Sequence, residues 1–293
     1  MIETVTNART RFVIARDDVA VAFDSRTERI YDRSALAKVL DENRAFWRLQ
    51  DVTVGEFVSL LIEAGRLREV RFGFPGRSML RYTWGDVPLY PLVQSLKPEG
   101  YFTHYSAMHL HGLTEQVPKT IYLNSEQKLR AGGGQLTQGG IDRAFKGRCR
   151  VSQQIAEIRE HRVCLLNGQN TDRLGVMELP HGGYPLRVTD IERTLIDATV
   201  RPVYSGGVFE VAKAYEIAKD KISVNKLAAT LRTLNFTYPY HQSVGFYLER
   251  AGYKDSQLQL MRQFSREYDF YLDYQMKGPR YLPSWKLYVP QGL

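Results

Sequence analysis

One short stretch, between Thr53 and Trp84, constrains the fold of this chain more than any other part of its sequence. Glu56 follows Thr53 at the spacing of a capping box, which predicts that a helix begins there. Apolar residues then recur at helical spacing, and Gly65 is placed to end the helix. Residues 67–74 and 78–84 predict two strands that form a hairpin. A helix followed by a hairpin is typical of a winged helix–turn–helix, which is a DNA-binding fold.

The expected hairpin is rich in arginine. A three-residue loop, Pro75-Gly76-Arg77, would pair Val70 with Tyr82 and Phe72 with Leu80, and would set Arg71 opposite Arg81. Like charges that face each other are unfavourable unless an anion neutralises them, and a phosphate would do so. This region carries a local charge of +4, from Arg66, Arg68, Arg71, Arg77 and Arg81 against Glu69.

The candidate DNA-binding residues are basic side chains together with two hydroxyl groups of the capped helix. They are Arg44, Arg48, Thr53, Ser59, Arg66, Arg68, Arg71, Arg77 and Arg81. The helix offers hydroxyl, acidic and apolar groups rather than the Arg, Asn or Gln that usually read base edges. We therefore expect the arginines to contribute more to binding than the helix does.

The rest of the N-terminal region is expected to supply short strands and further helices. Residues 12–15 and 19–23 are interpreted as strands or as an arm. Ser34 is expected to cap a helix that buries Leu36, Val39 and Leu40, with Phe46 and Trp47 continuing the buried stripe and a short helix over 43–51. Prolines at 88 and 91 indicate a boundary between a winged-helix domain, 1–88, and a mixed α/β domain, 89–293.

Charge is distributed unevenly along the chain, whose formal net charge is +8. Residues 1–86 hold 14 Lys and Arg against 13 Asp and Glu, whereas the remainder holds 26 against 19. A second basic surface is therefore expected in the C-terminal domain. Its candidates, opposed only by Asp142, are Lys128, Arg130, Arg143, Lys146, Arg148 and Arg150.

Composition predicts an ordinary cytoplasmic protein. No apolar run approaches the ~18 residues of a membrane span, and the first residues do not resemble a secretory signal. Cys149 and Cys164 match no metal-ligand spacing and are interpreted as reduced thiols. We expect no cofactor, no metal and no membrane partner.

The C-terminal region mixes both kinds of element, so the fold class expected for the whole chain is α+β. Helices are predicted over 104–111, 208–219, 224–234, 242–251 and 255–264, and strands over 119–124, 163–166, 175–179, 268–274 and 285–289. A second capping box, Thr189 with Glu192, predicts another helix, which Pro202 stops. The glycine-rich segment 131–140 is interpreted as a flexible loop.

Two patterns invite a catalytic or metal interpretation. His104, His109 and His111 do not have the i, i+4 spacing of a zinc pair on a helix, so structural histidines are favoured. Glu126-Gln127-Lys128 matches the E-x-K of metal-dependent, restriction-type nucleases, but the sequence shows no suitably placed upstream Asp. The nuclease alternative stays open, although the chain is expected not to be an enzyme.

Several C-terminal segments resemble the AbiEi-type antitoxins of type IV toxin–antitoxin systems. They are YFTHYSAMHLHGLTEQVPK (101–119), DIERTLIDATVRP (190–202), SGG (205–207), YPYHQ (238–242) and WKLYVP (285–290). The resemblance implies an N-terminal winged helix that binds double-stranded operator DNA, usually inverted repeats, and represses its own operon. It also implies a C-terminal antitoxin domain that opposes a nucleotidyltransferase toxin encoded nearby, without a stable complex being required.

Three hypotheses follow from the sequence. The first is a non-enzymatic, DNA-binding autorepressor and antitoxin. The second is a metal-dependent nuclease with an accessory winged helix. The third is an interaction module whose winged helix binds protein.

Overall fold

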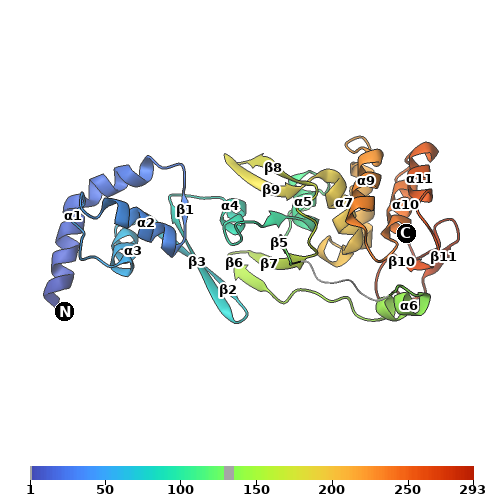
Figure 1. Ribbon diagram of the computed structural model, residues 1–293, viewed down its shortest axis with the longest axis horizontal. Coiled ribbons are helices and arrows are strands. Elements are labelled where there is room, and N and C mark those ends of the chain that lie inside the picture. The colour runs from blue at the N-terminus through green and yellow to red at the C-terminus, as the bar shows by residue number, and fades with distance from the viewer. Residues whose placement is uncertain (1, 129–134) are drawn as a thin grey trace. The chain divides into compact units, whose positions relative to one another are not determined.

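The structure, a computed structural model, describes residues 2–128 and 135–293 and is a mixed α+β fold (Figure 1). It divides into two compact units. The N-terminal unit runs to Leu96 and includes Ala156–Ile158, and the C-terminal unit comprises Lys97–Ile155 and Arg159–Leu293. None of the helices in the described residues combines the length and the apolar character that crossing a bilayer requires.

The N-terminal unit combines helices with one three-stranded sheet. Its elements are α1 (Ile2–Asp24), β1 (Ile30–Tyr31), α2 (Arg33–Asn43), α3 (Val54–Glu63), β2 (Leu67–Phe74), β3 (Arg77–Trp84) and α4 (Leu89–Gln94). The strand order is β1-β3-β2, and both pairings are antiparallel. Aromatic rings fill the core: Phe23 stacks on Trp84 at 4.5 Å, and Trp47 stacks on Phe57 at 5.8 Å between ring centroids. This core holds the sheet against the helices.

The interpretation of 12–15 and 19–23 as strands is wrong, because both lie in the long helix α1. The buried side chains of this helix follow helical spacing; in its described part they are Phe12, Ala15, Val19, Ala20 and Phe23. The pattern was hidden because Val13, Ile14 and Val21 lie exposed on the same helix. Exposed apolar residues make a helix look continuously hydrophobic and so favour a strand interpretation.

Two further predictions in this unit need correction. Asp32, not Ser34, caps α2, because its carboxylate accepts from the backbone N–H of Ala35 at 2.8 Å. The short helix expected over 43–51 does not form, since Asn43 ends α2 and turns follow from Arg44. In these turns Arg48 adopts a left-handed backbone, with φ of 55°, which a helix does not allow. Trp47 is buried as expected, but Phe46 is 71% exposed.

The capping box of α3 is confirmed. The Thr53 hydroxyl accepts from the Glu56 N–H at 3.2 Å, and the Glu56 carboxylate accepts from the Thr53 N–H at 2.8 Å. Gly65, with φ of 67°, follows the helix in the left-handed region that favours glycine. Phe57, Leu60 and Leu61 are buried as expected.

The hairpin of β2 and β3 forms, but in a different register from the one expected. Its loop has two residues, Pro75 and Gly76, and Gly76 takes φ of 77°, as the third position of a type II turn requires. Arg71 therefore lies opposite Leu80, and Arg81 lies opposite Val70. Because a one-residue slip moves side chains to the other face of a strand, the opposed pair of arginines does not exist.

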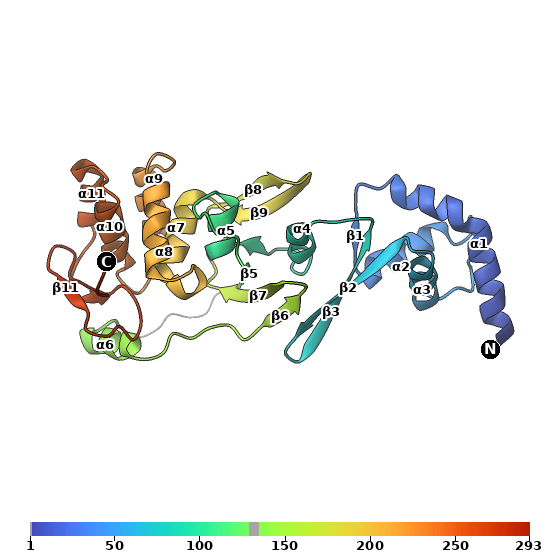
Figure 2. The same ribbon diagram turned by 180° about the vertical axis from the view of Figure 1, so that it is seen from behind.

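A six-stranded mixed sheet has the order β6-β7-β5-β4-β9-β8 (Figure 2), and all of its strands except the edge strand β6 belong wholly to the C-terminal unit. The strands are β4 (Tyr101–Phe102), β5 (Thr120–Glu126), β6 (Ile155–Ile158), β7 (His161–Gly168), β8 (Val176–His181) and β9 (Tyr184–Thr189). β5 runs parallel to β7, and β4 runs parallel to β9. The helices α5 (His104–Leu110) and α7 (Ile191–Val200) contact β5 and β9 respectively.

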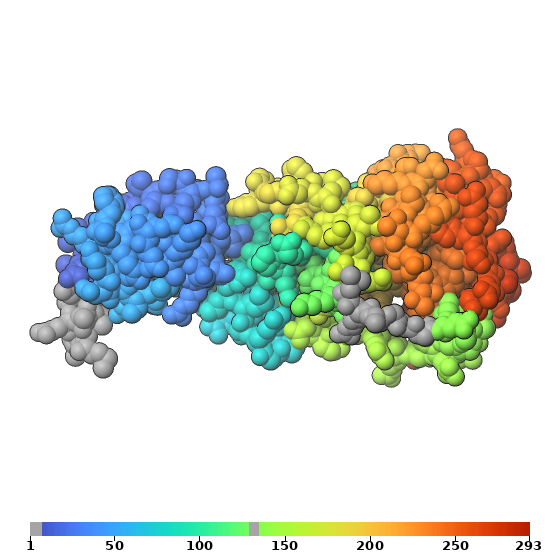
Figure 3. All heavy atoms as spheres, viewed as in Figure 1, coloured from blue at the N-terminus to red at the C-terminus, as the bar shows by residue number. Residues whose placement is uncertain are grey.

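Helices and a small second sheet complete this unit. They are α6 (Gln138–Lys146), η1 (Pro202–Tyr204), α8 (Val208–Ile217), α9 (Val224–Leu234), α10 (Tyr240–Arg250), α11 (Asp255–Arg262), β10 (Phe270–Tyr271), β11 (Arg280–Leu282) and β12 (Leu287–Val289). The orange and red residues of Figure 3, from α9 to the C-terminus, form the surface at one end of the unit. One large apolar core, which includes Tyr215, Tyr247 and Trp285, packs these helices together.

Three C-terminal predictions also need correction. Asp190, rather than Thr189, caps α7, since Thr189 is the last residue of β9 and Glu192 pairs with Lys226 instead. The strand expected over 268–274 is only Phe270–Tyr271. The glycine-rich segment ends earlier than expected, because α6 begins at Gln138; its residues 131–134 lie outside the described part of the chain.

Candidate functional site

The two hydroxyl candidates on α3 have different surroundings. Thr53 is exposed, but its hydroxyl accepts from the Glu56 N–H and donates to the Glu56 carboxylate at 2.8 Å. The capping box therefore uses this hydroxyl both as a donor and as an acceptor. These hydrogen bonds lower the pKa of the Glu56 carboxyl. Ser59 lies exposed one turn further along the helix. The exposed side of α3 is thus short of groups that would read bases directly.

Two of the candidate arginines stabilise the unit itself. The Arg44 guanidinium donates to the Asp41 carboxylate at 2.6 Å and to the Val52 carbonyl at 2.6 Å. Arg81 is half-buried and donates to the hydroxyl and carbonyl of Ser95, at 3.1 and 2.8 Å. Burial lowers the pKa of Arg81. Both side chains therefore serve chiefly to hold backbone segments together.

The other five arginines are exposed. Arg68 pairs with Asp86, and Arg71 pairs with Glu69 at 3.4 Å. Arg48, Arg66 and Arg77 have no carboxylate partner within the described residues. In the observed register Arg68, Arg77 and Arg81 share one face of the hairpin, whereas Arg71 lies on the other. The available positive charge is therefore at the two ends of the hairpin and in the turn after α2.

The second basic surface divides into two parts. Lys128 and Arg150 line a cavity in the C-terminal unit, whereas Arg143, Lys146 and Arg148 are exposed in or just after α6 and do not line it. Arg130 lies outside the described residues.

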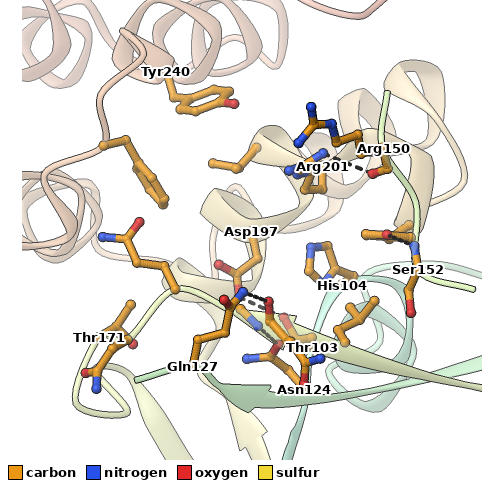
Figure 4. A pocket seen from close by; sticks show the side chains of 18 of the residues that line it. Thr103, His104, Asn124, Gln127, Arg150, Ser152, Thr171, Asp197, Arg201 and Tyr240 are labelled. Carbon is orange, nitrogen blue, oxygen red and sulfur yellow. Dashed lines mark hydrogen bonds between the residues drawn. The ribbon is translucent and has the colours of Figure 1, made fainter. Parts of the chain in front are cut away.

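The C-terminal cavity has a volume of about 790 Å³. Its wall includes the carboxyl ends of the parallel strands β5 and β7, the start of α5, the last turn of α7 and the segment before α10. In Figure 4, Arg201 and Tyr240 lie on one side, Asn124, Gln127 and Thr171 lie on the other, and His104 lies between them. Ligands of α/β sheets commonly bind outside the carboxyl ends of parallel strands.

A buried ion pair forms the floor of the cavity. Arg193 Nε and Asp197 Oδ1 are 2.7 Å apart on α7, and both side chains are at least 90% buried. The Thr103 hydroxyl donates to the other Asp197 oxygen at 2.7 Å, and Arg193 donates to the Leu174 carbonyl at 2.8 Å. Burial acts to lower the pKa of Arg193, but the charge and hydrogen bond of Asp197, together with Tyr101 and Glu126, raise it overall. Each charge is thus compensated by the other.

Arg201, at the end of α7, contrasts with Arg193. Its guanidinium donates to Cys149 Sγ at 3.2 Å and to the Arg150 carbonyl at 3.3 Å. In the described part of the chain, no carboxylate pairs with this half-buried cation. Its positive charge therefore faces the cavity without a counter-charge.

His104 stands out among the three histidines that the sequence singled out. It is 9% exposed, its backbone takes φ of 52°, and its Nδ1 is buried without a hydrogen-bond partner. Burial lowers its pKa to about 4, so the imidazole is neutral at pH 7. His111 Nε2, in contrast, lies 2.6 Å from the Thr189 carbonyl oxygen.

The glutamate of the E-x-K segment is held by hydrogen bonds from within the protein. Glu126 accepts hydrogen bonds from the Tyr101 hydroxyl at 2.9 Å, from the Thr171 N–H at 3.0 Å and hydroxyl, and from the Arg173 N–H at 3.2 Å. Burial acts to raise the pKa of Glu126, but these donors lower it overall. Across 2–128 and 135–293, no three His, Cys, Asp or Glu residues come together in a way that could hold a metal ion.

The sequence did not single out the cavity, although one signal was present. Arg193, Asp197 and Arg201 recur every four residues within the segment 190–202, which places them on one face of a helix. Polar residues on a buried helix face indicate a network or a site. Which elements close the other walls could not be read from this spacing.

Comparison with known proteins identifies the fold alone. No family model matches the chain, and no curated protein matches it. Among solved structures, the chain is similar to the crystal structure of the RV2827C protein from Mycobacterium tuberculosis, with a TM-score of 0.62 and 14% sequence identity. The likeness covers 94% of this chain and 90% of that one. The fold thus recurs in a protein of very different sequence.

Proposed function

We propose that this chain is a DNA-binding transcriptional regulator whose N-terminal unit is a winged helix–turn–helix. The observation that carries the proposal is the element order α1-β1-α2-α3-β2-β3, in which a capped helix leads directly into an antiparallel hairpin. Winged-helix proteins use such a helix and hairpin to contact double-stranded DNA. The proposed domain corresponds to residues 1–88, and the mixed α/β domain to 89–293.

The charges of this unit refine which residues would contact DNA. Arg48, Arg66 and Arg77 are exposed and lack a carboxylate partner in the described chain, so they are the proposed phosphate ligands. Arg68 and Arg71 would first have to leave their acidic partners. Arg44 and Arg81 would act indirectly, by holding the turn after α2 and the base of the hairpin. Binding would thus depend more on the phosphate backbone than on base edges.

The antitoxin part of the proposal rests on the resemblance of the C-terminal segments to AbiEi-type antitoxins. On that basis the chain would repress its own operon and oppose a nucleotidyltransferase toxin encoded nearby. We propose no enzymatic activity for it, and the hydrogen-bonded Glu126 speaks against the nuclease alternative. Coexpression with a neighbouring nucleotidyltransferase should restore growth, and continued toxicity despite soluble expression would contradict the antitoxin assignment.

The DNA proposal is tested by the salt dependence of binding to the chain's own upstream region. Replacing Arg48, Arg66 and Arg77 by Ala should weaken binding, and the slope of log K against log salt should fall by about 1 for each phosphate that is no longer neutralised. Lys213→Ala is the control for loss of charge outside the interface, because it removes one exposed positive charge from α8 in the C-terminal unit. Unchanged affinity and slope in the triple variant would exclude this interface, and no binding by the unaltered protein at low salt would exclude the function.

A further inference from the structure

The geometry of the C-terminal cavity points to a second, separate function: this cavity binds a free nucleoside phosphate. Cationic side chains would hold the phosphate, and aromatic and amide side chains would hold the base. The inference concerns the C-terminal unit alone and does not depend on DNA binding by the N-terminal unit. The volume of about 790 Å³ falls within the roughly 300–1,000 Å³ of typical ligand pockets.

An excess of positive charge lines the cavity. Lys128, Arg150, Arg193 and Arg201 contribute to its described wall, whereas Asp197 is the only acidic residue there. Arg193 and Asp197 compensate each other, so the remaining three cations carry the excess. Arg201 is the most informative of them, because its half-buried guanidinium is held in place by Cys149 and the Arg150 carbonyl, yet it pairs with no carboxylate of the described chain and can take an anion as partner.

His104 provides an independent indication of a ligand. Its side chain is about nine-tenths buried, and its Nδ1 has no partner although nearly all buried polar groups have one. Its backbone is left-handed, which is uncommon for a residue other than glycine and is concentrated at functional sites. In Figure 4 the imidazole lies between Asp197 and Ser152, below Arg201, and faces the cavity. Because Nδ1 itself is closed to solvent, the ring would hydrogen-bond a ligand held by Arg201 through its other nitrogen, Nε2.

Aromatic side chains in the wall of the cavity are suited to bind a base. Tyr238, Tyr240 and Tyr274 line the cavity, and Phe145 holds two of them from behind, stacking on Tyr274 at 4.4 Å and meeting Tyr238 edge-on at 5.4 Å. Such a supported aromatic wall offers ring surfaces on which a base can stack. Amide side chains also line the cavity, among them Gln169 and Asn170, and amides can pair with the edge of a base. Cations beside aromatic and amide groups match a nucleotide better than a simple anion.

The site is built for binding rather than for catalysis. Asp197 is the one carboxylate in the described wall, and both of its oxygens accept hydrogen bonds from Arg193 and Thr103. It is therefore not available to activate a nucleophile. The neutral His104 can donate or accept a hydrogen bond but lacks a carboxylate that would orient it as a base.

The test is calorimetric titration of the full chain with the four common nucleoside 5′-monophosphates and the corresponding triphosphates. The matching nucleosides, inorganic phosphate and a short single-stranded oligonucleotide serve as comparison probes. We expect at least one nucleotide to bind with one-to-one stoichiometry and a dissociation constant below about 1 mM. Its nucleoside and inorganic phosphate should each bind at least about tenfold more weakly, because each lacks either the phosphate or the base that the cavity would hold.

Variants locate the binding. Arg201→Gln and Arg150→Gln should each weaken nucleotide binding by about tenfold or more, since each removes a charged hydrogen bond. Arg150 is exposed, so this variant keeps the test valid if Arg201→Gln fails to fold. Arg143→Gln is the matched control, because it removes the same charge from α6 outside the cavity and should leave binding unchanged.

Three outcomes would overturn the inference. The first is that no nucleotide binds the folded protein. The second is that inorganic phosphate binds as well as every nucleotide, or the oligonucleotide binds while free nucleotides do not. The third is that Arg150→Gln and Arg143→Gln weaken binding equally, which would indicate general electrostatic attraction.

Discussion

Replacing Gly245 by alanine tests how the C-terminal core is packed. Gly245 lies in the middle of α10, where alanine would ordinarily be favoured by about 1 kcal/mol over glycine. In this structure, however, a Cβ at that position would lie 2.2 Å from Cζ3 and 2.4 Å from Cη2 of Trp285. Local helix propensity and tertiary packing therefore predict opposite effects of the same methyl group.

The magnitudes decide which effect prevails. Carbon atoms in contact prefer a separation of about 3.5–4.0 Å, so the indole ring would have to move by more than about 1 Å. Trp285 is fully buried, and its Nε1 donates to Glu249 at 2.9 Å, which limits such a movement. Overpacking of this kind costs typically about 1–3 kcal/mol, and a displacement this large belongs at the upper end. After the gain in helix propensity, we expect Gly245→Ala to destabilise the protein by about 2 kcal/mol.

The measurement is urea unfolding followed by far-UV circular dichroism, because the signal of the helices can be followed also in a variant that lacks Trp285. Gly139→Ala on α6 is the control, since a Cβ there meets no atom within 4 Å and should leave stability unchanged or slightly raised. Adding Trp285→Phe to Gly245→Ala should cost less than the sum of the two single changes, because the shorter ring removes the clash. If Gly245→Ala is as stable as the unaltered protein, the proposed packing of α10 against Trp285 is wrong.

Two further predictions concern buried charged or titratable groups of the C-terminal unit. Asp197→Asn should lower the free energy of unfolding by about 3–5 kcal/mol, because it leaves Arg193 buried without a counter-charge. The double variant Arg193→Leu with Asp197→Leu should lose less of the free energy of unfolding than Asp197→Asn does. Urea unfolding measures both variants. If Asp197→Asn is as stable as the unaltered protein, the pair is not buried in solution. The second prediction concerns the pH dependence of stability. Burial lowers the pKa of His104 and His241 to about 4, whereas the pKa of a histidine in the unfolded chain is about 6.5. As the pH falls, the unfolded state therefore binds these protons before the folded state does. The contribution of these histidines to the free energy of unfolding should therefore be fully present above about pH 6.5 and be lost as the pH falls towards 4. In urea unfolding at several pH values, His241→Phe should make the free energy of unfolding fall less steeply. An identical pH profile would contradict the burial of His241.

Features with a local cause could be predicted from the sequence. The segment 224–234 was expected to be a helix and is one, because its apolar residues follow helical spacing without interruption. The capping box at Thr53 could also be predicted, because all of its groups lie within four residues. Where the spacing was interrupted, as in α1 with its exposed Val13 and Ile14, the prediction failed.

The candidate sites depend more heavily on distant contacts. Whether an arginine is available could not be judged from the sequence, because the partner of Arg81 is Ser95 in another element and Arg44 binds carbonyls in the following turn. The register of the hairpin depended on a single residue of loop length, which turn composition alone did not determine. The cavity has the same limitation, since its wall joins α5, α7, two strand ends and the segment before α10.

By itself the sequence determined the elements whose signals are local: the capped helix α3, the presence of a basic hairpin after it, and the succession of helices in the C-terminal unit. Hydrogen bonds and side-chain contacts within a few residues suffice for these. Only the tertiary structure decided which arginines carry free charge and that His104 and Arg201 meet Tyr240 around one cavity. Burial and charge compensation depend on residues far apart in the chain, and folding alone brings them together.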